Sequence, residues 1–301
     1  MQQVRILDGG MSRELVRLGA ELRQPEWSAL ALVDSPQIVQ QVHAAFIEAG
    51  ADIVTTNSYA LVPFHIGEER FRSEGRELIA LAGRLARRAA DEAGRGTLVA
   101  GSLPPIFGSY ELQLFQPDRV QDYLRVLVEE LDPFVDVWLG ETLSLIAEGE
   151  AVRNAVAATG KPFWISFTLE DRPDAEASEP ALRSGESVAA AARWAGVSGT
   201  EALLFNCSRP EVMVGAVETA ARHFRSLDRE IAVGVYANAF ENANEEDGAA
   251  NETLHQTRED LDQDRYGRFA CDWVEAGASI IGGCCGIGAA HIHQLADRLR
   301  R

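Results

Sequence analysis

Three cysteines lie in two short motifs whose spacing predicts a metal site. Cys207 directly follows an apolar run at 202–206, and Cys284 and Cys285 are neighbours inside the glycine-rich stretch 282–286. Glycine permits backbone angles that other residues disfavour, so both neighbouring sulfur atoms can turn toward one ion. Three soft sulfur ligands fit zinc best, and a fourth position left open is typical of a catalytic site. The alternative is three structural cysteines buried in a core.

The chemistry of such a site follows from its charge. Zinc with three thiolates carries a net charge of about −1, which disfavours hydroxide and favours a bound thiol as fourth ligand. Zinc lowers the pKa of a coordinated thiol from about 8.5, so the thiolate exists at neutral pH and stays nucleophilic. We therefore expect a sulfur atom to attack an alkyl group by in-line displacement at carbon.

The remaining cysteine and the histidines are weaker candidates for this site. Cys271 lies in the middle of a helical pattern, where core packing is the expected role. His291 and His293 are two residues apart on a predicted helix and face different directions. His255, in a long acidic segment, is the histidine that stays a candidate for the fourth ligand position.

The elements that must position these cysteines alternate along the whole chain. Short apolar or β-branched runs predict eight strands, at 4–7, 52–56, 97–102, 136–140, 163–169, 202–206, 231–236 and 279–282. Helical patterns lie at 36–49, 67–93, 117–131, 144–158, 187–195, 210–225, 258–276 and 289–300. This order predicts an α/β fold, a (β/α)8 TIM barrel that forms a single domain over residues 1–301. The ends of strands 6 and 8 lie on the same rim of such a barrel, so the three thiols can converge there.

Three long segments follow predicted strands 3, 5 and 7, at 104–117, 170–186 and 239–257. They belong to the strand-to-helix face, where barrel enzymes build their sites. Loops of this length are uncommon without a role, so we expect at least one of them to act as a lid.

Composition excludes several classes of function. The 301 residues are 46% apolar and 25% charged, as in ordinary soluble globular proteins. The net charge of −18 would repel nucleic acid and anionic membranes, so we expect small-molecule partners only. The chain shows neither a signal-peptide pattern nor a stretch long enough to span a bilayer, so we expect a cytoplasmic protein. The oligomeric state is left open.

The motifs resemble those of the homocysteine S-methyltransferase family, whose members are zinc-dependent (β/α)8 barrels. The family signature is Asn-Cys after strand 6 and Gly-Gly-Cys-Cys-Gly after strand 8, found here at 206–207 and 282–286. The segments at 7–15, 49–59 and 141–143 also match. The resemblance covers essentially the whole chain and implies methyl transfer to homocysteine, which gives methionine.

The resemblance also implies roles for individual residues. Cys207, Cys284 and Cys285 would hold Zn²⁺, and the thiolate of homocysteine would fill the fourth position. Asp8 and Glu141 are acidic residues at strand ends, and they would bind the ammonium group of the amino acid. The alternative for either carboxylate is a structural one, a helix cap or a turn.

Three further residues are candidates for the substrate pocket. Tyr59 and Asn238 fall where the family lines its pocket, although Tyr59 is equally compatible with a core or rim aromatic residue. Asn206 is expected either to orient the neighbouring Cys207 or to cap the following helix.

The methyl donor stays open between S-methylmethionine and S-adenosylmethionine. The chain reads Gly-Ser-Leu-Pro-Pro at 101–105, where relatives that use S-methylmethionine typically have Gly-Ser-Val-Gly-Pro, and 235–240 also departs from the family pattern. These loops would face the donor. Sulfonium and quaternary ammonium groups are often held by aromatic rings, for which Phe107, Tyr110 and Trp138 are candidates, although core packing is the expected role of Trp138.

Other functions compatible with the same motifs are betaine as the methyl donor, a different thiol or a selenol as the acceptor, and a non-catalytic zinc- or thiol-binding protein.

Overall fold

Eight parallel strands follow one another around a barrel in the computed structural model, which describes residues 4–172, 179–240 and 258–300. The strands are β1 (Arg5–Ile6), β2 (Ile53–Thr55), β3 (Leu98–Leu103), β4 (Val137–Leu143), β5 (Phe163–Phe167), β6 (Ala202–Asn206), β7 (Ala232–Tyr236) and β8 (Ile280–Ile281). From β2 to β8 each strand pairs with the next, and β8 pairs with β1. A bridge between Leu7 and Ile53 closes the ring. The predicted single-domain TIM barrel is confirmed.

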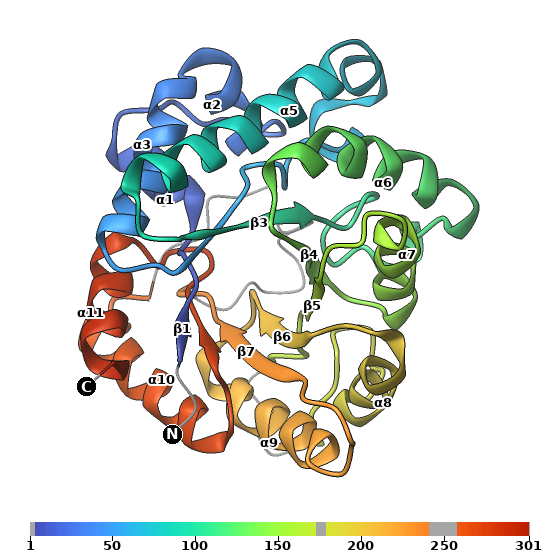
Figure 1. Ribbon diagram of the computed structural model, residues 1–301, viewed down its shortest axis with the longest axis vertical. Coiled ribbons are helices and arrows are strands. Elements are labelled where there is room, and N and C mark those ends of the chain that lie inside the picture. The colour runs from blue at the N-terminus through green and yellow to red at the C-terminus, as the bar shows by residue number, and fades with distance from the viewer. Residues whose placement is uncertain (1–3, 173–178, 241–257, 301) are drawn as a thin grey trace.

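Helices surround the strands on the outside of the barrel (Figure 1). The α-helices are α1 (Met11–Arg17), α2 (Ser28–Asp34), α3 (Pro36–Glu48), α4 (Pro63–Ile66), α5 (Glu68–Ala93), α6 (Pro117–Leu131), α7 (Ile146–Val156), α8 (Val188–Ser198), α9 (Met213–Phe224), α10 (Gln263–Ala276) and α11 (Ala289–Leu299). In the part of the chain that the structure describes, none of them combines the length and apolar character that a membrane span requires.

The predicted helices differ from the observed ones mainly at their starts and in three short additions. The sequence pattern did not indicate α1, α2 and α4, which have seven, seven and four residues, because two turns or fewer show no helical periodicity. Helix α10 begins five residues after the predicted start at Arg258. Its true start is set by Asp262, whose carboxylate accepts a hydrogen bond from the Arg265 N–H at 2.8 Å.

Alternate side chains of the strands face the barrel axis and form an apolar cluster of their own. Its buried members are Leu7, Ile53, Ala100, Val137, Leu139, Trp164, Ala202, Leu204, Tyr236 and Ile280. The residues between them point outward and pack under the helices. Trp138 is one of these, and its indole N–H donates to Thr159 Oγ1 at 2.9 Å. Trp138 therefore belongs to the outer core, as expected for it, and not to the mouth of the barrel, where a methyl donor would be held.

The barrel interior becomes polar at the carboxyl ends of the strands. The next inward-facing positions along β2 to β7 carry Thr55, Ser102, Glu141, Ser166, Asn206 and Tyr236. This ring of polar side chains lies above the apolar layers. It is the floor on which any site at this end of the barrel is built.

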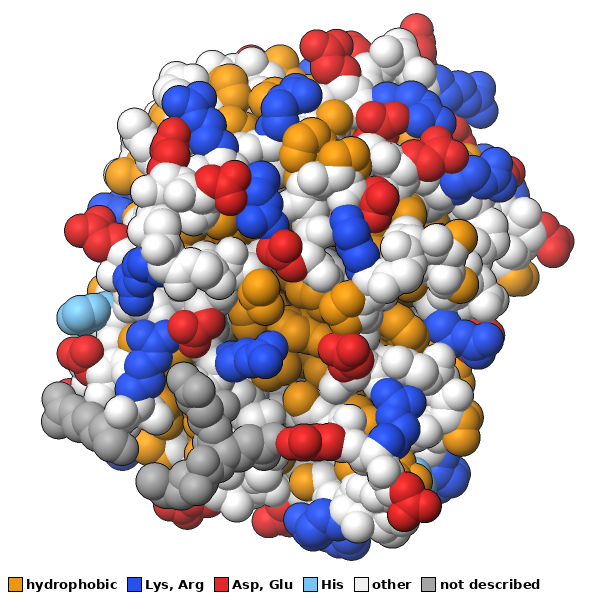
Figure 2. Space-filling model, in the orientation of Figure 1, with side chains coloured by type: hydrophobic (Ala, Val, Ile, Leu, Met, Phe, Trp, Pro, Cys, Tyr) orange, Lys and Arg blue, Asp and Glu red, His pale blue; other side chains and the backbone are white. Residues whose placement is uncertain are grey.

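Charged side chains of both signs are mixed over the face that Figure 2 shows, around a central apolar area. Arg76 of α5, for example, pairs with Glu129 of α6 at 2.8 Å. Exposed pairs of this kind contribute roughly 0–1 kcal/mol each. The barrel therefore depends on its two apolar clusters and not on these surface pairs.

Packing inside the barrel predicts a strong effect of substituting Gly234 in β7. A Cβ atom at this position would lie 2.8 Å from Leu204 Cγ and 3.0 Å from Ile280 Cβ. We expect Gly234→Val to lower the free energy of unfolding by about 1–3 kcal/mol, because neighbouring strands must move apart. Urea unfolding followed by circular dichroism measures this change.

Gly75→Ala in α5 is the matched control, because its added Cβ lies 3.4 Å from Phe71, an ordinary contact. Removing a helical glycine should raise the free energy of unfolding by up to about 1 kcal/mol. An unfolding midpoint for Gly234→Val equal to that of the wild type would contradict the packing described here.

Candidate active site

Three thiols converge at the carboxyl ends of β6 and β8. The Sγ atoms of Cys207, Cys284 and Cys285 all lie within 4.8 Å of one another, and those of Cys284 and Cys285 are 4.0 Å apart. Cys207 is buried and the other two are half-buried. Sulfur ligands about 2.3 Å from a tetrahedral zinc ion stand about 3.8 Å from one another. The spacing and the all-sulfur donor set therefore fit one soft metal ion.

The local backbone brings the sulfur atoms together in two ways. Cys207 adopts a left-handed conformation with φ of 49°, and so does Gly286 with φ of 84°. Gly282 and Gly283 have ordinary φ angles and serve close packing instead. A Cβ atom on Gly283 would lie 2.1 Å from Ile287 Cγ2. The glycines around the cysteine pair are thus needed partly for conformation, as expected, and partly because no side chain fits.

The pKa values of the three thiols depend on one another because the thiols are hydrogen-bonded. The pKa of Cys207 is held well below its usual value, first because Cys284 and then because Cys285 donate hydrogen bonds to its sulfur. The same bonds with Cys207, together with burial, raise the pKa of Cys284 far above its usual value. One thiolate is therefore favoured without metal, and further ionisation needs a cation close to all three sulfur atoms.

Asn206 lies directly beneath this cluster with its carboxamide fully hydrogen-bonded. Its Oδ1 accepts from Ser166 Oγ at 2.7 Å and from the Thr142 N–H at 3.2 Å. Its Nδ2 donates to Thr142 Oγ1 at 2.8 Å and to Cys284 Sγ at 4.0 Å. The side chain therefore faces Cys284. This geometry corrects the expectation that it orients Cys207 or caps the following helix.

Two buried carboxyl groups lie on the same rim. Asp8 accepts hydrogen bonds from the Thr55 N–H at 2.7 Å and from Thr55 Oγ1 at 3.1 Å, and it is 5% exposed. Glu141 accepts from Ser102 Oγ at 2.5 Å. Neither carboxyl group forms an ion pair with an arginine, lysine or histidine of the described residues.

Burial dominates the protonation of both groups. It raises the pKa of Asp8 to about 8, and the nearby Glu141 adds to the shift by charge repulsion. Burial likewise raises the pKa of Glu141 to about 7, and the negative charge at Cys207 contributes. Two buried carboxylates without a positive partner form a site that a cationic group would stabilise.

The segment after β3 crosses the mouth of the barrel near these groups. Tyr59, which follows β2, shares a hydrogen bond with Ser109 of this segment at 2.5 Å. Tyr110 donates to the backbone oxygen of Cys207 at 3.1 Å. The guanidinium carbon of Arg183 lies 4.2 Å from the centre of the Tyr110 ring. Residues 104–117 thus connect the end of β2 with the end of β6, on the face where the sequence placed them.

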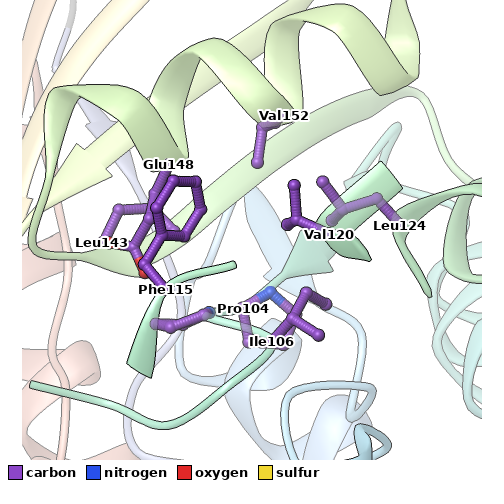
Figure 3. A pocket seen from close by; sticks show the side chains of 9 residues that line it. Pro104, Ile106, Phe115, Val120, Leu124, Leu143, Glu148 and Val152 are labelled. Atoms are coloured by element: carbon purple, nitrogen blue, oxygen red, sulfur yellow. The ribbon is translucent and has the colours of Figure 1, made fainter. Parts of the chain in front are cut away.

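The ends of the same segment are packed into the body of the protein. Figure 3 shows Pro104, Ile106 and Phe115 around a small cavity that residues of α6 and α7 also line. The cavity measures about 10 Å³, close to the room that one water molecule needs. Glu148 at its edge accepts from the Ser144 N–H at 2.8 Å, and burial raises its pKa to about 7. Glu148 thus holds the start of α7 and lies outside the thiol cluster.

Asn238 stands beside the cysteine turn and is linked to it through the backbone of its neighbours. Its N–H donates to Ser208 O at 3.1 Å. Its two neighbours bind the backbone of the cysteine pair: Ala237 O accepts from the Cys284 N–H at 2.9 Å, and the Ala239 N–H donates to Cys285 O at 2.8 Å. Asn238 is 8% exposed and lies at the rim that the sequence predicted for it.

The other candidates are distributed as follows. Phe107 packs edge-on against Tyr123, with ring centres 5.9 Å apart. Cys271 is half-buried on α10 and does not belong to the thiol cluster. His255 and the rest of the segment 241–257 lie outside the described residues, as does 173–178 in the segment after β5.

Sequence reasoning missed Ser166 and Tyr236 of the polar ring, and Thr142 next to Glu141. The Tyr236 hydroxyl is buried close to Ser166 and Glu141. Burial, and next the negative charge of Glu141, raise the pKa of Tyr236 far above its usual value. The available signal was positional: a polar residue two places after an inward-facing apolar residue in a predicted strand lies inside the barrel mouth.

The buried carboxyl groups make a prediction about stability. Asp8 changes from a pKa of 3.8 to about 8 on folding, so the folded state holds a proton that the unfolded state releases. Its contribution to the free energy of unfolding is present at low pH and is lost as pH rises toward 8. We expect Asp8→Asn to be more stable than the wild type at pH 8.5 and to have a clearly smaller advantage at pH 5.5, nearer the unfolded pKa.

Urea unfolding of the reduced, metal-free protein at both pH values tests this expectation. Asp34→Asn, at an exposed position, is the control and should match the wild type at both. An equal advantage of Asp8→Asn at the two pH values would show that burial of the charge is not the cause.

Comparison with known proteins agrees with the site geometry. Residues 5–299 match the sequence profile of the family described as homocysteine S-methyltransferase. Homocysteine S-methyltransferase 1 of Zea mays is 31% identical over 325 residues, which cover 98% of this chain and 94% of the relative. Homocysteine S-methyltransferase of Escherichia coli is 31% identical over 314 residues, covering 99% and 96%.

Solved structures show the same likeness. The metallated form of the homocysteine methyltransferase MmuM from Escherichia coli superimposes with a TM-score of 0.78 at 29% identity, and the match covers 99% of this chain and 96% of that one. With the profile match over nearly the whole barrel, these findings show that the chain belongs to the homocysteine S-methyltransferase family.

Proposed function

We propose that this chain is a zinc-dependent S-methyltransferase that transfers a methyl group from a sulfonium donor to homocysteine and forms methionine. The observation that carries the proposal is the cluster of three thiols, within 4.8 Å of one another, on the same rim as two buried carboxyl groups that pair with no cation among the described residues. Family membership supports methyl transfer as the reaction. Residues 1–301 act in this proposal as one homocysteine-binding domain.

The donor set supports zinc as the metal. Cys207, Cys284 and Cys285 supply only sulfur, which suits zinc better than magnesium or calcium. Bound there, zinc would lower the pKa of a substrate thiol and hold its sulfur as a nucleophile. The thiols themselves form no disulfide in the structure. A reducing, cytoplasmic compartment suits a site of this kind.

The two carboxyl groups fit the ammonium group of an amino acid. Asp8 and Glu141 lie close enough for the charge of Glu141 to raise the pKa of Asp8. An ammonium group between them replaces this repulsion by two attractive interactions in a buried setting. Thr55 and Ser102 hold the carboxylates in place by the hydrogen bonds described above. The amino-acid end of homocysteine is thereby oriented, and its sulfur is directed toward the thiol cluster.

The proposed transfer is a single displacement. The sulfur lone pair of homocysteine forms a bond to the donor methyl carbon, and the bond from that carbon to the sulfonium sulfur breaks. The electron pair of the broken bond stays on the donor sulfur, which becomes a neutral thioether. The acidic rim favours a cationic donor, and Tyr59 and Tyr110 supply aromatic rings at the mouth. S-methylmethionine and S-adenosylmethionine both satisfy this chemistry.

Transfer of an isotopically labelled methyl group tests the function directly. The reduced, zinc-loaded protein is given homocysteine and methyl-labelled S-methylmethionine, and product methionine is analysed by mass spectrometry. We expect labelled methionine from the wild type and none above background from Cys207→Ala, because one sulfur ligand is lost. Cys271→Ala is the matched control and should retain the activity, since Cys271 lies outside the cluster.

The same assay distinguishes the alternatives. Label transfer only from S-adenosylmethionine or from betaine would reassign the donor. A zinc-loaded protein that transfers label from none of these donors to homocysteine would contradict the proposed function.

Removing a carboxylate should affect one substrate selectively. We expect Asp8→Asn and Glu141→Gln each to raise the KM for homocysteine about tenfold to a hundredfold, the cost of losing one charged hydrogen bond. The KM for the donor should change much less. Steady-state kinetics with each substrate varied in turn give both values.

Glu148→Gln is the control for this series. Glu148 is a buried carboxyl group with a similarly raised pKa, but it lies at the cavity beside α7. Its substitution should leave the KM for homocysteine unchanged. Equal effects of all three substitutions would indicate a general loss of structure instead of a lost substrate contact.

A further inference from the structure

Strand β4 contains a strained residue at the point where it reaches the site. Thr142 has φ of 61°, in the left-handed region, and the register of β4 against β5 shifts between Gly140 and Leu143. A β-branched residue rarely adopts this strained conformation, which persists only where surrounding contacts enforce it. Glu141 immediately precedes Thr142, so the strained turn determines where the Glu141 carboxylate points.

The Asn206 carboxamide is the contact that enforces this turn. Its Oδ1 accepts from the Thr142 N–H and its Nδ2 donates to Thr142 Oγ1, so one amide binds the backbone and the side chain of the strained residue. Its other two bonds go to Ser166 Oγ and Cys284 Sγ. A flipped amide would place its NH₂ group against the Thr142 N–H, which can only donate, so only one orientation satisfies the four partners. Asn206 is 0% exposed, and water does not replace a bond that is lost.

We propose that Asn206 is a positioning residue that couples the two halves of the site: one amide holds the Cys284 sulfur from below and keeps the Glu141–Thr142 turn in its strained form. The identity of the two ligands, metal and homocysteine, rests on the function proposed above. The coupling itself rests on the four hydrogen bonds and on the backbone of Thr142.

The physical effect of the amide differs between the two halves. Toward Cys284, an N–H donor stabilises negative charge on sulfur and fixes the direction of its lone pairs, as outer contacts of metal ligands generally do. Toward Thr142, two bonds offset the strain of the left-handed turn. Loss of Asn206 should therefore weaken metal binding through Cys284 and, separately, homocysteine binding through Glu141.

Three variants separate these effects. Asn206→Ala removes all four bonds. Asn206→Asp keeps the acceptors for Ser166 and the Thr142 N–H but removes both donors, and it is the conservative variant if the alanine protein folds poorly. Thr142→Gly allows the left-handed turn without strain, because glycine adopts it freely. Asn57→Ala is the matched control, a buried asparagine that donates to Ser28 O at 3.1 Å.

The measurements use Co²⁺ as a spectroscopic metal in the full chain. Affinity is obtained by competition with a chelator, and the sulfur-to-cobalt absorption bands report the environment of the thiolates. Homocysteine is then titrated into the Co²⁺-loaded protein. We expect Asn206→Ala and Asn206→Asp to lower Co²⁺ affinity about tenfold to a hundredfold and to shift the absorption bands. Asn206→Ala should also weaken homocysteine binding about tenfold.

The double variant Asn206→Ala with Thr142→Gly gives the decisive comparison. We expect homocysteine affinity to return to within about threefold of Thr142→Gly alone, since the strain is gone. The Co²⁺ affinity should stay low, because the bond to Cys284 is still missing. Asn57→Ala should lower stability without changing either affinity.

Unchanged Co²⁺ bands and affinities in both Asn206 variants would overturn the coupling. Homocysteine binding that fails to recover in the double variant would overturn the role in the turn. A wild-type protein that binds neither Co²⁺ nor homocysteine would instead contradict the proposed function, so the two failures are distinguishable.

Discussion

The site depends on one electrostatic constraint: three sulfur atoms within 4.8 Å of one another cannot all be ionised unless a cation lies between them. The polypeptide satisfies the geometric part of this constraint before any cation arrives. The left-handed backbone of Cys207, the close packing at Gly283 and the bond from Asn206 to Cys284 all hold sulfur atoms where mutual repulsion would otherwise separate them. The barrel keeps the sulfur atoms close despite this repulsion, because its strands are buried on both sides and the rim cannot relax.

The barrel also buries two carboxyl groups, Asp8 and Glu141, which costs further electrostatic energy. Both carboxyl groups are protonated more readily than usual because they are buried, and each has a hydroxyl group from a neighbouring strand to accept from. A site that is stable without its ligand would have polar, uncharged side chains at these positions. Acidic side chains make sense there only if a cation completes the arrangement.

The sequence predicted much of this arrangement because the relevant signals are local. Each of the eight strands appeared as a short apolar run, and Cys207, Cys284 and Cys285 were found by their residue type and their place at strand ends. The bulge in β4 left no such signal, since the shift after Gly140 depends on contacts with Asn206, 64 residues away. The direction of the Asn206 side chain and the outward position of Trp138 likewise follow from strand pairing, which a single sequence does not reveal. Short helices such as α1 were missed because two turns carry too little pattern.

The placement of the thiols in the chain has a consequence for biosynthesis. Cys207 lies after β6, whereas Cys284 and Cys285 follow β8, the strand that pairs with β1 and completes the ring. A nascent chain that has not yet folded its last β/α unit holds one of the three thiols of the cluster in place. The cluster of three thiols is therefore complete only when the last β/α unit has closed the barrel.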